Sequence, residues 1–332
     1  DNMENLIAWQ IELIHWLQSI GSWLTAPMEY LSLSGSEQFY LLVAPAIYWC
    51  WDTTLGLQTG LFLMLNANIN AYLKILLHTS RPFWVSTTIK HLAFESSFGL
   101  PSGHAQNAAV FWGTLGAYFR KAWLWVLLIV LIFFVGLSRL YLAVHFPHDV
   151  LVGWVLGILV LWLFLRLTSP VSAWIKRQSF STQIGAIFAF SLLLILLGFL
   201  SRLASSGFEL PSAWVDNAAS SFPEEDLINP LDISGIVSNA GAFFGLAAGA
   251  CWLRTRGGFN VSGSAAQRFG RYVLGALGVF LLWFGLGEVF PRGETFLPFL
   301  LRFIRYGLVG FWVTALAPLI FIKIRLAKPD QH

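Results

Sequence analysis

Three short blocks of the sequence hold ionisable side chains whose types and spacing suit chemistry on an oxyanion such as phosphate. In chain order they are Lys74-x6-Arg81-Pro82, Pro101-Ser102-Gly103-His104 and Ser138-Arg139-x5-His145-x3-Asp149. All three lie at the ends of long apolar runs, and ionisable residues at membrane depth are costly and usually functional. They are therefore the first candidates for a functional site.

Five residues of these blocks are candidates for binding a phosphate. Lys74, Arg81 and Arg139 supply three cations, whose point and fork donors suit phosphate oxygens. The turn at Ser102 and Gly103 opens a helix, so free backbone amides and the positive end of the helix dipole face an anion. Because Gly103 has no side chain, an oxyanion can approach the backbone closely.

Two histidines and a carboxylate add nucleophilic and acid–base chemistry. One of His104 and His145 can attack phosphorus while the other protonates the leaving oxygen. Asp149 follows Pro147, which favours a helix start, and from there it could fix the tautomer of His145 and stabilise its imidazolium. His148 adjoins the block without belonging to it, so we expect it to support the helix start or its neighbours. The blocks hold no carboxylate cluster for Mg²⁺, and we therefore expect no metal or other cofactor.

The composition indicates which elements must position these residues. The chain has 332 residues, 57% of them hydrophobic and 11% charged, with a mean hydropathy of +0.68. A soluble domain carries about 25% charged residues, and the apolar runs here, roughly 16–25 residues each, suit helices that cross a bilayer. The sequence therefore predicts an all-α, polytopic membrane protein. A net charge of +3 gives no reason to expect a nucleic-acid partner, and Cys50 and Cys251, both inside apolar runs, predict neither a disulfide framework nor a zinc site.

We expect nine membrane spans. They lie near 38–53, 56–77, 102–119, 122–144, 148–167, 183–203, 234–253, 271–290 and 304–325. The stretch 5–24 is interrupted by polar residues and is expected to be an amphipathic helix in the membrane interface. Residues 170–181 are expected to be a polar connection, and residues 204–233 a solvated acidic loop, with a lid over the site as the alternative. Gly241-x3-Gly245-x3-Gly249 predicts a packing face of small residues within the chain.

Charge asymmetry between the connections predicts the orientation. With nine spans, one side of the membrane carries only two acidic residues, Asp52 and Asp330, against twelve basic ones. These are Arg120, Lys121, Arg166, Lys176, Arg177, Arg254, Arg256, Arg268, Arg271, Lys323, Arg325 and Lys328. The positive-inside rule assigns this side to the cytoplasm. The three blocks and the N-terminus are then expected on the extracytoplasmic side, and the C-terminus in the cytoplasm.

The three blocks resemble the signature motifs of the phosphatidic acid phosphatase type 2 superfamily, namely Lys-x6-Arg-Pro, Pro-Ser-Gly-His and Ser-Arg-x5-His-x3-Asp. Every signature position is matched in order across residues 74–149. The resemblance implies phosphate ester hydrolysis without metal, with His145 as the nucleophile that forms a phosphohistidine, His104 as the general acid and Asp149 as the residue that orients His145. It also implies a phosphate-binding set, which comprises Lys74, Arg81, Ser102, Gly103 and Arg139.

The same resemblance suggests a division of the chain into four segments, because the superfamily has a six-helix core. Residues 1–37 would be an N-terminal interfacial segment and residues 38–203 the six-helix phosphatase core, unless the stretch 5–24 replaces the sixth helix. Residues 204–233 would be the extracytoplasmic loop, and residues 234–332 a three-helix C-terminal extension about which the motifs say nothing.

The substrate class is left open between two branches of the superfamily. The stretches 81–84 and 138–148 resemble glucose-6-phosphatase, but that branch lacks the acid found here at Asp149, whereas lipid phosphate phosphatases keep it. We therefore expect a phosphorylated lipid substrate and membrane lipids as partners, with a sugar phosphate as the alternative; the oligomeric state is not predicted. Two hypotheses from different functional classes are a non-catalytic lipid-binding homologue and a vanadate-dependent haloperoxidase, although the latter is water-soluble.

The loop after the second span offers groups for either substrate. Its polar residues, which include Glu95, could bind sugar hydroxyls. Its aromatic residues could form an interfacial belt or the rim of an entry for acyl chains; these are Phe83, Trp84, Phe94 and Phe98.

Overall fold

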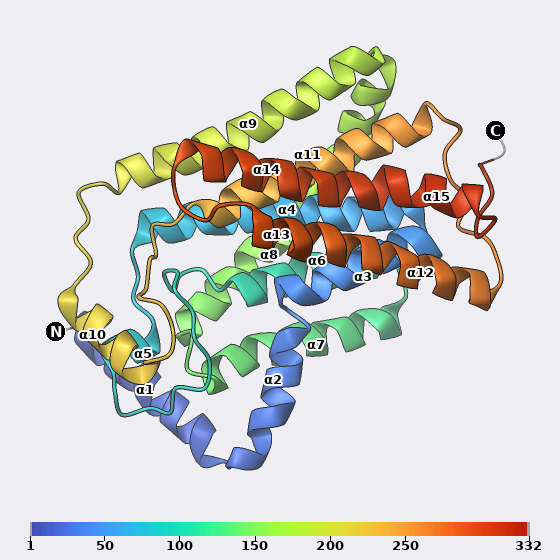
Figure 1. Ribbon diagram of the computed structural model, residues 1–332. Coiled ribbons are helices and arrows are strands. Elements are labelled where there is room, and N and C mark those ends of the chain that lie inside the picture. Colours follow the sequence, from blue (N-terminus) through green and yellow to red (C-terminus); the bar gives the residue numbers. More distant parts are fainter. Residues whose placement is uncertain (1, 331–332) are drawn as a thin grey trace. The chain divides into compact units, whose positions relative to one another are not determined.

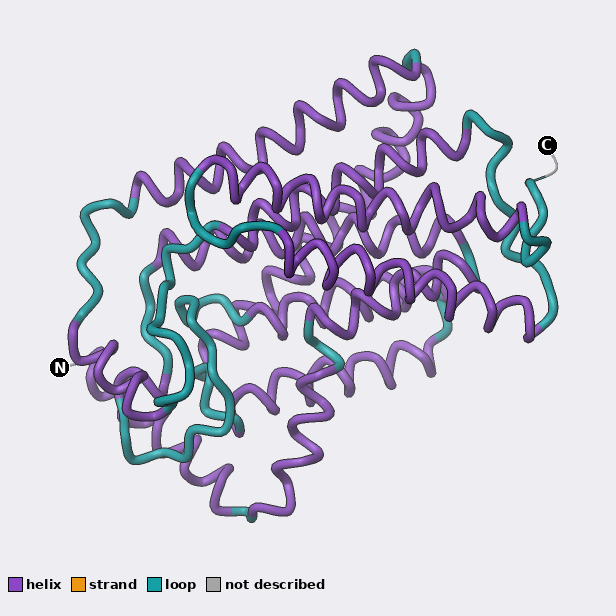
Figure 2. The backbone as a smooth tube through the Cα atoms, in the orientation of Figure 1, coloured by secondary structure: helices purple, strands orange, loops and turns teal. Residues whose placement is uncertain are grey.

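The structure is a computed structural model that describes residues 2–330, and long helices account for most of this range (Figures 1 and 2). Within residues 2–330, seven helical segments are long and apolar enough to cross a membrane. They are Thr53–Val85, Ala122–Tyr141, Pro147–Arg177, Phe180–Ala204, Ser234–Arg254, Ala265–Val289 and Phe296–Lys323. The predicted all-α, polytopic membrane architecture is thus confirmed.

The two other predicted spans form shorter helices. They are α3 (Glu37–Cys50), with 14 residues, and α6 (Gly103–Phe119), with 17. At a rise of about 1.5 Å per residue, α3 extends only ~21 Å, short of the ~30 Å hydrocarbon core. The count of nine spans therefore stays a prediction.

The chain forms two compact units. The first comprises Asp1–Ser36, Ile69–Leu161 and Leu200–Asp232, and the second comprises Glu37–Asn68, Trp162–Phe199 and Ile233–His332. Helices α4 (Thr53–Leu77), α8 (Pro147–Arg177) and α9 (Phe180–Ala204) each contribute to both.

Close packing of α6 against α8 fixes the centre of the first unit. A Cβ atom at Gly153 of α8 would lie 2.7 Å from the Ser102 carbonyl oxygen, and one at Gly157 would lie 2.8 Å from that of Gln106. Only glycine therefore allows the two helix backbones to approach so closely. Helix α7 (Ala122–Tyr141) packs against both α6 and α2 (Thr25–Leu33), while α1 (Asn2–Ser19) confirms a helix in the stretch 5–24.

Three of the four aromatic residues after α4 form a buried core, which corrects for them the expectation of a membrane belt or an acyl-chain rim, while Phe94 is partly buried against this core. Phe83 and Trp84, in the short helix α5 (Pro82–Val85), and Phe98 are 0% exposed. They contact aromatic residues of the acidic segment: the Trp84 and Trp214 rings lie 5.7 Å apart, and those of Phe83 and Phe222 lie 5.5 Å apart. The sequence pattern did not reveal this burial because the partners lie more than a hundred residues away.

The acidic segment 204–233 is more ordered than a solvated connection. It contains α10 (Ser212–Ser221), which packs against α5, and the Asn217 side-chain amide donates to the Trp84 carbonyl oxygen at 2.9 Å. The segment thereby covers the aromatic core.

In the second unit, α11 (Ser234–Arg254) packs along α14 (Phe296–Phe311), as Figure 1 shows. A Cβ atom at Gly245 would lie 2.0 Å from the Gly307 carbonyl oxygen, which confirms the predicted packing face within the chain. The unit also contains α12 (Ala265–Phe280), α13 (Leu286–Val289) and α15 (Ala317–Lys323), and two π-helical turns, η2 (Leu281–Gly285) and η3 (Trp312–Leu316).

Helix α8 differs from the expected polar connection at 170–181. It continues through Pro170 to Arg177, so only Gln178 and Ser179 separate it from α9. A proline removes a single backbone hydrogen bond, and the basic residues at the end of the helix favour its negative dipole end.

Candidate functional site

The structure brings all three sequence blocks together in the first unit. Lys74 lies in the last turn of α4, Arg139 in the last turn of α7 and Asp149 in the first turn of α8. Arg81 is the N-cap of α5 and Ser102 the N-cap of α6. The candidate residues thus collect where five helices begin or end.

His145 and Asp149 form the pair that the sequence predicts. The Nδ1 atom of His145 lies 3.2 Å from Oδ2 of Asp149, which also accepts the Phe146 amide at 2.9 Å. A proton held on Nδ1 by the carboxylate leaves the lone pair on Nε2, and this atom lies 3.3 Å from Nη1 of Arg81. Burial and the nearby guanidinium of Arg81 hold the pKa of His145 well below its ordinary value. The imidazole is therefore neutral near pH 7, the form that a nucleophile requires.

His148 supports Asp149 from the other side, as expected. Its Nε2 atom lies 3.2 Å from Oδ1 of Asp149, and its Nδ1 atom lies 2.7 Å from Oε1 of Gln10 in α1. The N-terminal helix is thereby connected to the site.

The guanidinium of Arg81 is fully buried and held by backbone carbonyls. Its Nη1 atom donates to the Val144 carbonyl oxygen at 2.7 Å, Nε to that of Ser97 at 2.5 Å, and Nη2 to that of Phe98 at 3.1 Å. These bonds fix the guanidinium beside His145.

The Ser97 hydroxyl connects the two cations of the first block. It accepts from Nζ of Lys74 and from Nη2 of Arg81, each at 3.0 Å. Arg139 has a partner of its own, because its Nη1 atom donates to the Ser32 hydroxyl at 2.6 Å.

The start of α6 has the geometry that the second block predicts. The Ser102 hydroxyl accepts the Ala105 amide, and the Ser102 amide donates to the Asp149 carbonyl oxygen at 2.9 Å. This last bond joins the second block to the third. His104 lies in the first turn of α6 and is half-buried.

Glu95 is the site residue whose role the sequence did not reveal. Its Oε1 atom lies 2.5 Å from Nη2 of Arg139 and its Oε2 atom 3.8 Å from Nη2 of Arg81. Burial acts to raise the pKa of Glu95, but Arg81, Arg139, His104 and Lys74 outweigh it and hold this pKa at about 2. One signal was available: Glu95 is the only acidic residue between Asp52 and Asp149.

A metal site would need a cluster of ligands. Across residues 2–330, no three His, Cys, Asp or Glu side chains are grouped so that they could hold a metal ion. The charged groups around Glu95 are instead mainly cations, which suit an anionic ligand.

Known families account for most of the chain. The model of the PAP2 superfamily matches residues 55–173, and that of the PAP2 superfamily phosphatase transmembrane extension matches residues 237–329. Phosphatidylglycerophosphatase B of Bacillus subtilis (strain 168) is 32% identical over 155 residues, which are 42% of this chain and 73% of that protein. The chain belongs to the PAP2 superfamily. It is therefore a membrane phosphatase, and its three blocks lie within the residues that the superfamily model matches.

PAP2 relatives differ in how much of the chain they cover. Glucose-6-phosphatase 3 of Rattus norvegicus is 28% identical over 312 residues, 85% of this chain and 84% of the relative. Undecaprenyl-diphosphatase of Sulfolobus acidocaldarius is 28% identical over 144 residues, 43% of this chain and 69% of the relative. The similarity to the glucose-6-phosphatase thus covers most of the chain, whereas the similarity to each of the two lipid phosphatases covers less than half of it.

Proposed function

We propose that this PAP2 phosphatase hydrolyses phosphate monoesters of membrane lipids through a phosphohistidine on His145. The observation that carries the proposal is the contact between Nδ1 of His145 and the Asp149 carboxylate at 3.2 Å. It supports a neutral imidazole whose Nε2 lone pair is directed at the cations that would hold the phosphate.

The first half-reaction transfers the phosphoryl group to the enzyme. Lys74, Arg81 and Arg139 bind the phosphate oxygens together with the amides at the start of α6. Nε2 of His145 attacks phosphorus, and the bond from phosphorus to the ester oxygen breaks as His104 donates a proton to the departing alcohol. The developing imidazolium of His145 is stabilised by the carboxylate of Asp149.

The second half-reaction regenerates the enzyme. His104, now neutral, takes a proton from a water molecule whose oxygen attacks phosphorus. The bond from phosphorus to Nε2 breaks, inorganic phosphate leaves, and His145 returns to its neutral form with its proton on Nδ1. The balance requires no metal ion or other cofactor.

Asp149 also supports the choice of a lipid substrate, because lipid phosphate phosphatases keep an acid at this position and glucose-6-phosphatases do not. Two relatives with lipid substrates in their names support the same choice. A lipid brings its own membrane affinity, about 0.8 kcal/mol per buried CH₂ group, so the protein need not enclose its tail.

A sugar phosphate is the second candidate. The full-length similarity to glucose-6-phosphatase 3, which covers 85% of this chain, favours it. The rate of hydrolysis should depend on the surface concentration of a lipid substrate but not of a sugar phosphate, because only a lipid is concentrated in the membrane surface.

The positive-inside distribution of basic residues supports a site on the extracytoplasmic side, with the N-terminus outside and the C-terminus in the cytoplasm. The motif positions support residues 38–203 as the catalytic core, with residues 234–332 as an extension.

The test is phosphate release by purified protein from phosphatidate, phosphatidylglycerol phosphate, polyprenyl phosphates and glucose 6-phosphate in detergent micelles. A lipid enzyme should show a kcat/KM that rises with chain length, and its turnover should fall when the lipid is diluted in mixed micelles. If glucose 6-phosphate is cleaved as efficiently as the lipids, the sugar-phosphate hypothesis replaces the lipid one.

A further inference from the structure

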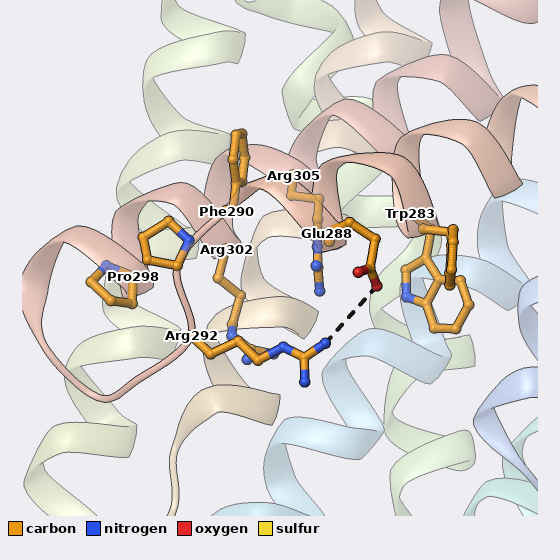
Figure 3. Close-up of a pocket in the computed structure, with 10 residues that line it drawn as sticks. Trp283, Glu288, Phe290, Arg292, Pro298, Arg302 and Arg305 are labelled. Atoms are coloured by element: carbon orange, nitrogen blue, oxygen red, sulfur yellow. Dashed lines mark ion pairs between the residues drawn. The ribbon is translucent and has the colours of Figure 1, made fainter.

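A second cluster of cations lies in the second unit, where residues 290–295 join α13 to α14. An open cavity of about 270 Å³ lies between this connection and the helices on either side of it. Arg292, Arg302 and Arg305 line it together with Glu288, and Figure 3 shows these side chains reaching toward the same space. None of these residues belongs to the PAP2 motifs.

The cavity has an excess of positive charge. Its one carboxylate, Glu288, lies 4.0 Å from Arg292, and both side chains are well exposed, so this ion pair is weak. Glu288 is the only carboxylate among the described residues that line the cavity with Arg302 and Arg305. A pocket with three guanidinium groups and one acid favours an anion.

Arg305 lines the cavity. Its guanidinium stacks over the Tyr306 ring at 4.9 Å, and its buried Nε atom has no hydrogen-bond partner among residues 2–330. A snorkelling arginine would extend its charged end into the headgroup region. A buried donor without a partner is costly, and the charge of this guanidinium favours an anion in the cavity that Arg305 lines.

The backbone around the cavity is shaped to admit Arg305. A Cβ atom at Gly287 would lie 2.6 Å from Nη1 of Arg305, so the guanidinium lies directly on the helix at a position without a side chain. The preceding turn, η2, is π-helical, a local widening that is frequent at functional sites. One of its residues, Trp283, donates from Nε1 to the Tyr306 hydroxyl at 3.2 Å and forms a wall.

The surroundings indicate that the anion is part of a lipid. The cavity lies where two candidate membrane spans, Ala265–Val289 and Phe296–Lys323, come to an end. Apolar side chains next to it are strongly exposed, with Phe296 at 81% and Val289 at 75%. The volume is slightly below the roughly 300–1,000 Å³ of sites for drug-sized ligands. It therefore suits a phosphate headgroup whose acyl chains remain outside, along the exposed apolar residues.

We propose that this cavity binds the phosphate group of an anionic phospholipid, with Arg302 and Arg305 as the principal ligands and Arg292 at the rim. The ligand chemistry is a phosphate ester held by planar guanidinium forks. Its source is the lipid bilayer rather than a soluble phosphate.

The experiment measures lipid retention by native mass spectrometry of the full-length protein, after delipidation and addition of phosphatidylglycerol or phosphatidylcholine with the same acyl chains. The test variant is Arg302→Gln with Arg305→Gln. The matched control is Arg256→Gln, which removes an exposed arginine of the same unit that stacks on Trp252 at 4.4 Å. Elution as a single species and phosphatase activity report on folding. If the double variant does not fold, the single variant Arg305→Gln makes the same comparison.

We expect wild-type protein and the Arg256→Gln control to retain phosphatidylglycerol several-fold more than phosphatidylcholine. The double variant should reduce that retention to the phosphatidylcholine level, and the single variant at least threefold. Equal retention of the two lipids by wild-type protein would overturn the proposal. So would unchanged retention in the double variant, because the lipid would then be bound at another site, such as the catalytic site.

A separate titration with inorganic phosphate identifies the source of the bound anion. If phosphate raises Tm through the same arginines while lipid retention does not depend on them, the ligand is a soluble anion and the lipid assignment is wrong.

Discussion

Glu95 and Arg139 form an ion pair at the centre of the candidate site, with Oε1 of Glu95 2.5 Å from Nη2 of Arg139. The second carboxylate oxygen of Glu95 faces Arg81 at 3.8 Å. The two carboxylate oxygens of Glu95 thus face two of the three cations that we assign to phosphate binding. A phosphate that binds both arginines must therefore compete with Glu95.

This competition makes vanadate affinity a direct measure of the role of Glu95. We expect Glu95→Gln to bind vanadate roughly tenfold or more tightly, because a charged hydrogen bond worth about 1.5–3 kcal/mol no longer has to be broken. Inhibition of phosphate release in a vanadate titration measures the change. The control is Glu225→Gln, an exposed acid of the same unit, which should leave the inhibition constant unchanged. Weaker vanadate inhibition in Glu95→Gln would show that Glu95 positions the arginines for the anion rather than competing with it.

The same residue predicts a dependence of stability on pH. The pKa of Glu95 is about 2 in the folded protein, below its ordinary value of 4.5. A carboxylate whose pKa is lowered on folding stabilises the folded state at pH values above the ordinary pKa, and this contribution is lost as the pH falls toward the folded pKa. Between about pH 5 and pH 3, Tm should fall more steeply in wild-type protein than in Glu95→Gln. Parallel slopes for the two proteins would contradict the lowered pKa.

Two histidine variants separate the nucleophile from the general acid. His145→Ala should give no phosphoenzyme and no turnover, because the atom that attacks phosphorus is missing. His104→Ala should lose roughly 10²–10⁴-fold in kcat, with the smallest loss for substrates whose leaving group needs no proton, such as nitrophenyl phosphate. Rapid acid-free quenching with labelled substrate detects the phosphohistidine. A phosphohistidine in His145→Ala protein would refute the assignment.

Cysteine labelling tests the orientation. In a background without Cys50 and Cys251, single cysteines at the exposed positions Thr87 and Ser220 should react with a membrane-impermeant reagent in intact cells. A cysteine at Ser262, which is also exposed, should react only after the cells are opened. The opposite pattern would place the site in the cytoplasm.

Local sequence signals were sufficient wherever a residue's partner lies close in the chain or its role depends on a helix end. The start of α6 at Gly103, the start of α8 at Pro147 and the pairing of His145 with Asp149 four residues later are of this kind. Hydropathy predicted seven segments that the structure confirms as candidate spans, because a helix that crosses a membrane must be long and apolar.

Tertiary contacts account for what the sequence did not predict. Glu95 could be interpreted only as a polar loop residue, because Arg139, its ion-pair partner, lies 44 residues further along the chain. From the sequence, Phe98 resembles an interfacial aromatic residue. In the structure, Phe208 of a distant segment packs against it, with 5.6 Å between the ring centroids. Arg305 lies in an amphipathic helix whose pattern does not reveal that Gly287 leaves space for a guanidinium.

The bond from the Ser102 amide to the carbonyl of Asp149 uses the backbone of that residue, while the side chain of Asp149 serves His145 and His148. Any amino acid at this position has the same carbonyl. The start of α6 can therefore stay in place when the carboxylate is exchanged, whereas the contacts of that side chain with His145, His148 and the Phe146 amide change. The backbone of Asp149 thus positions α6, while its side chain acts on the histidines. This separation gives a physical reason why one arrangement of helices can serve PAP2 branches with and without an acid at this position.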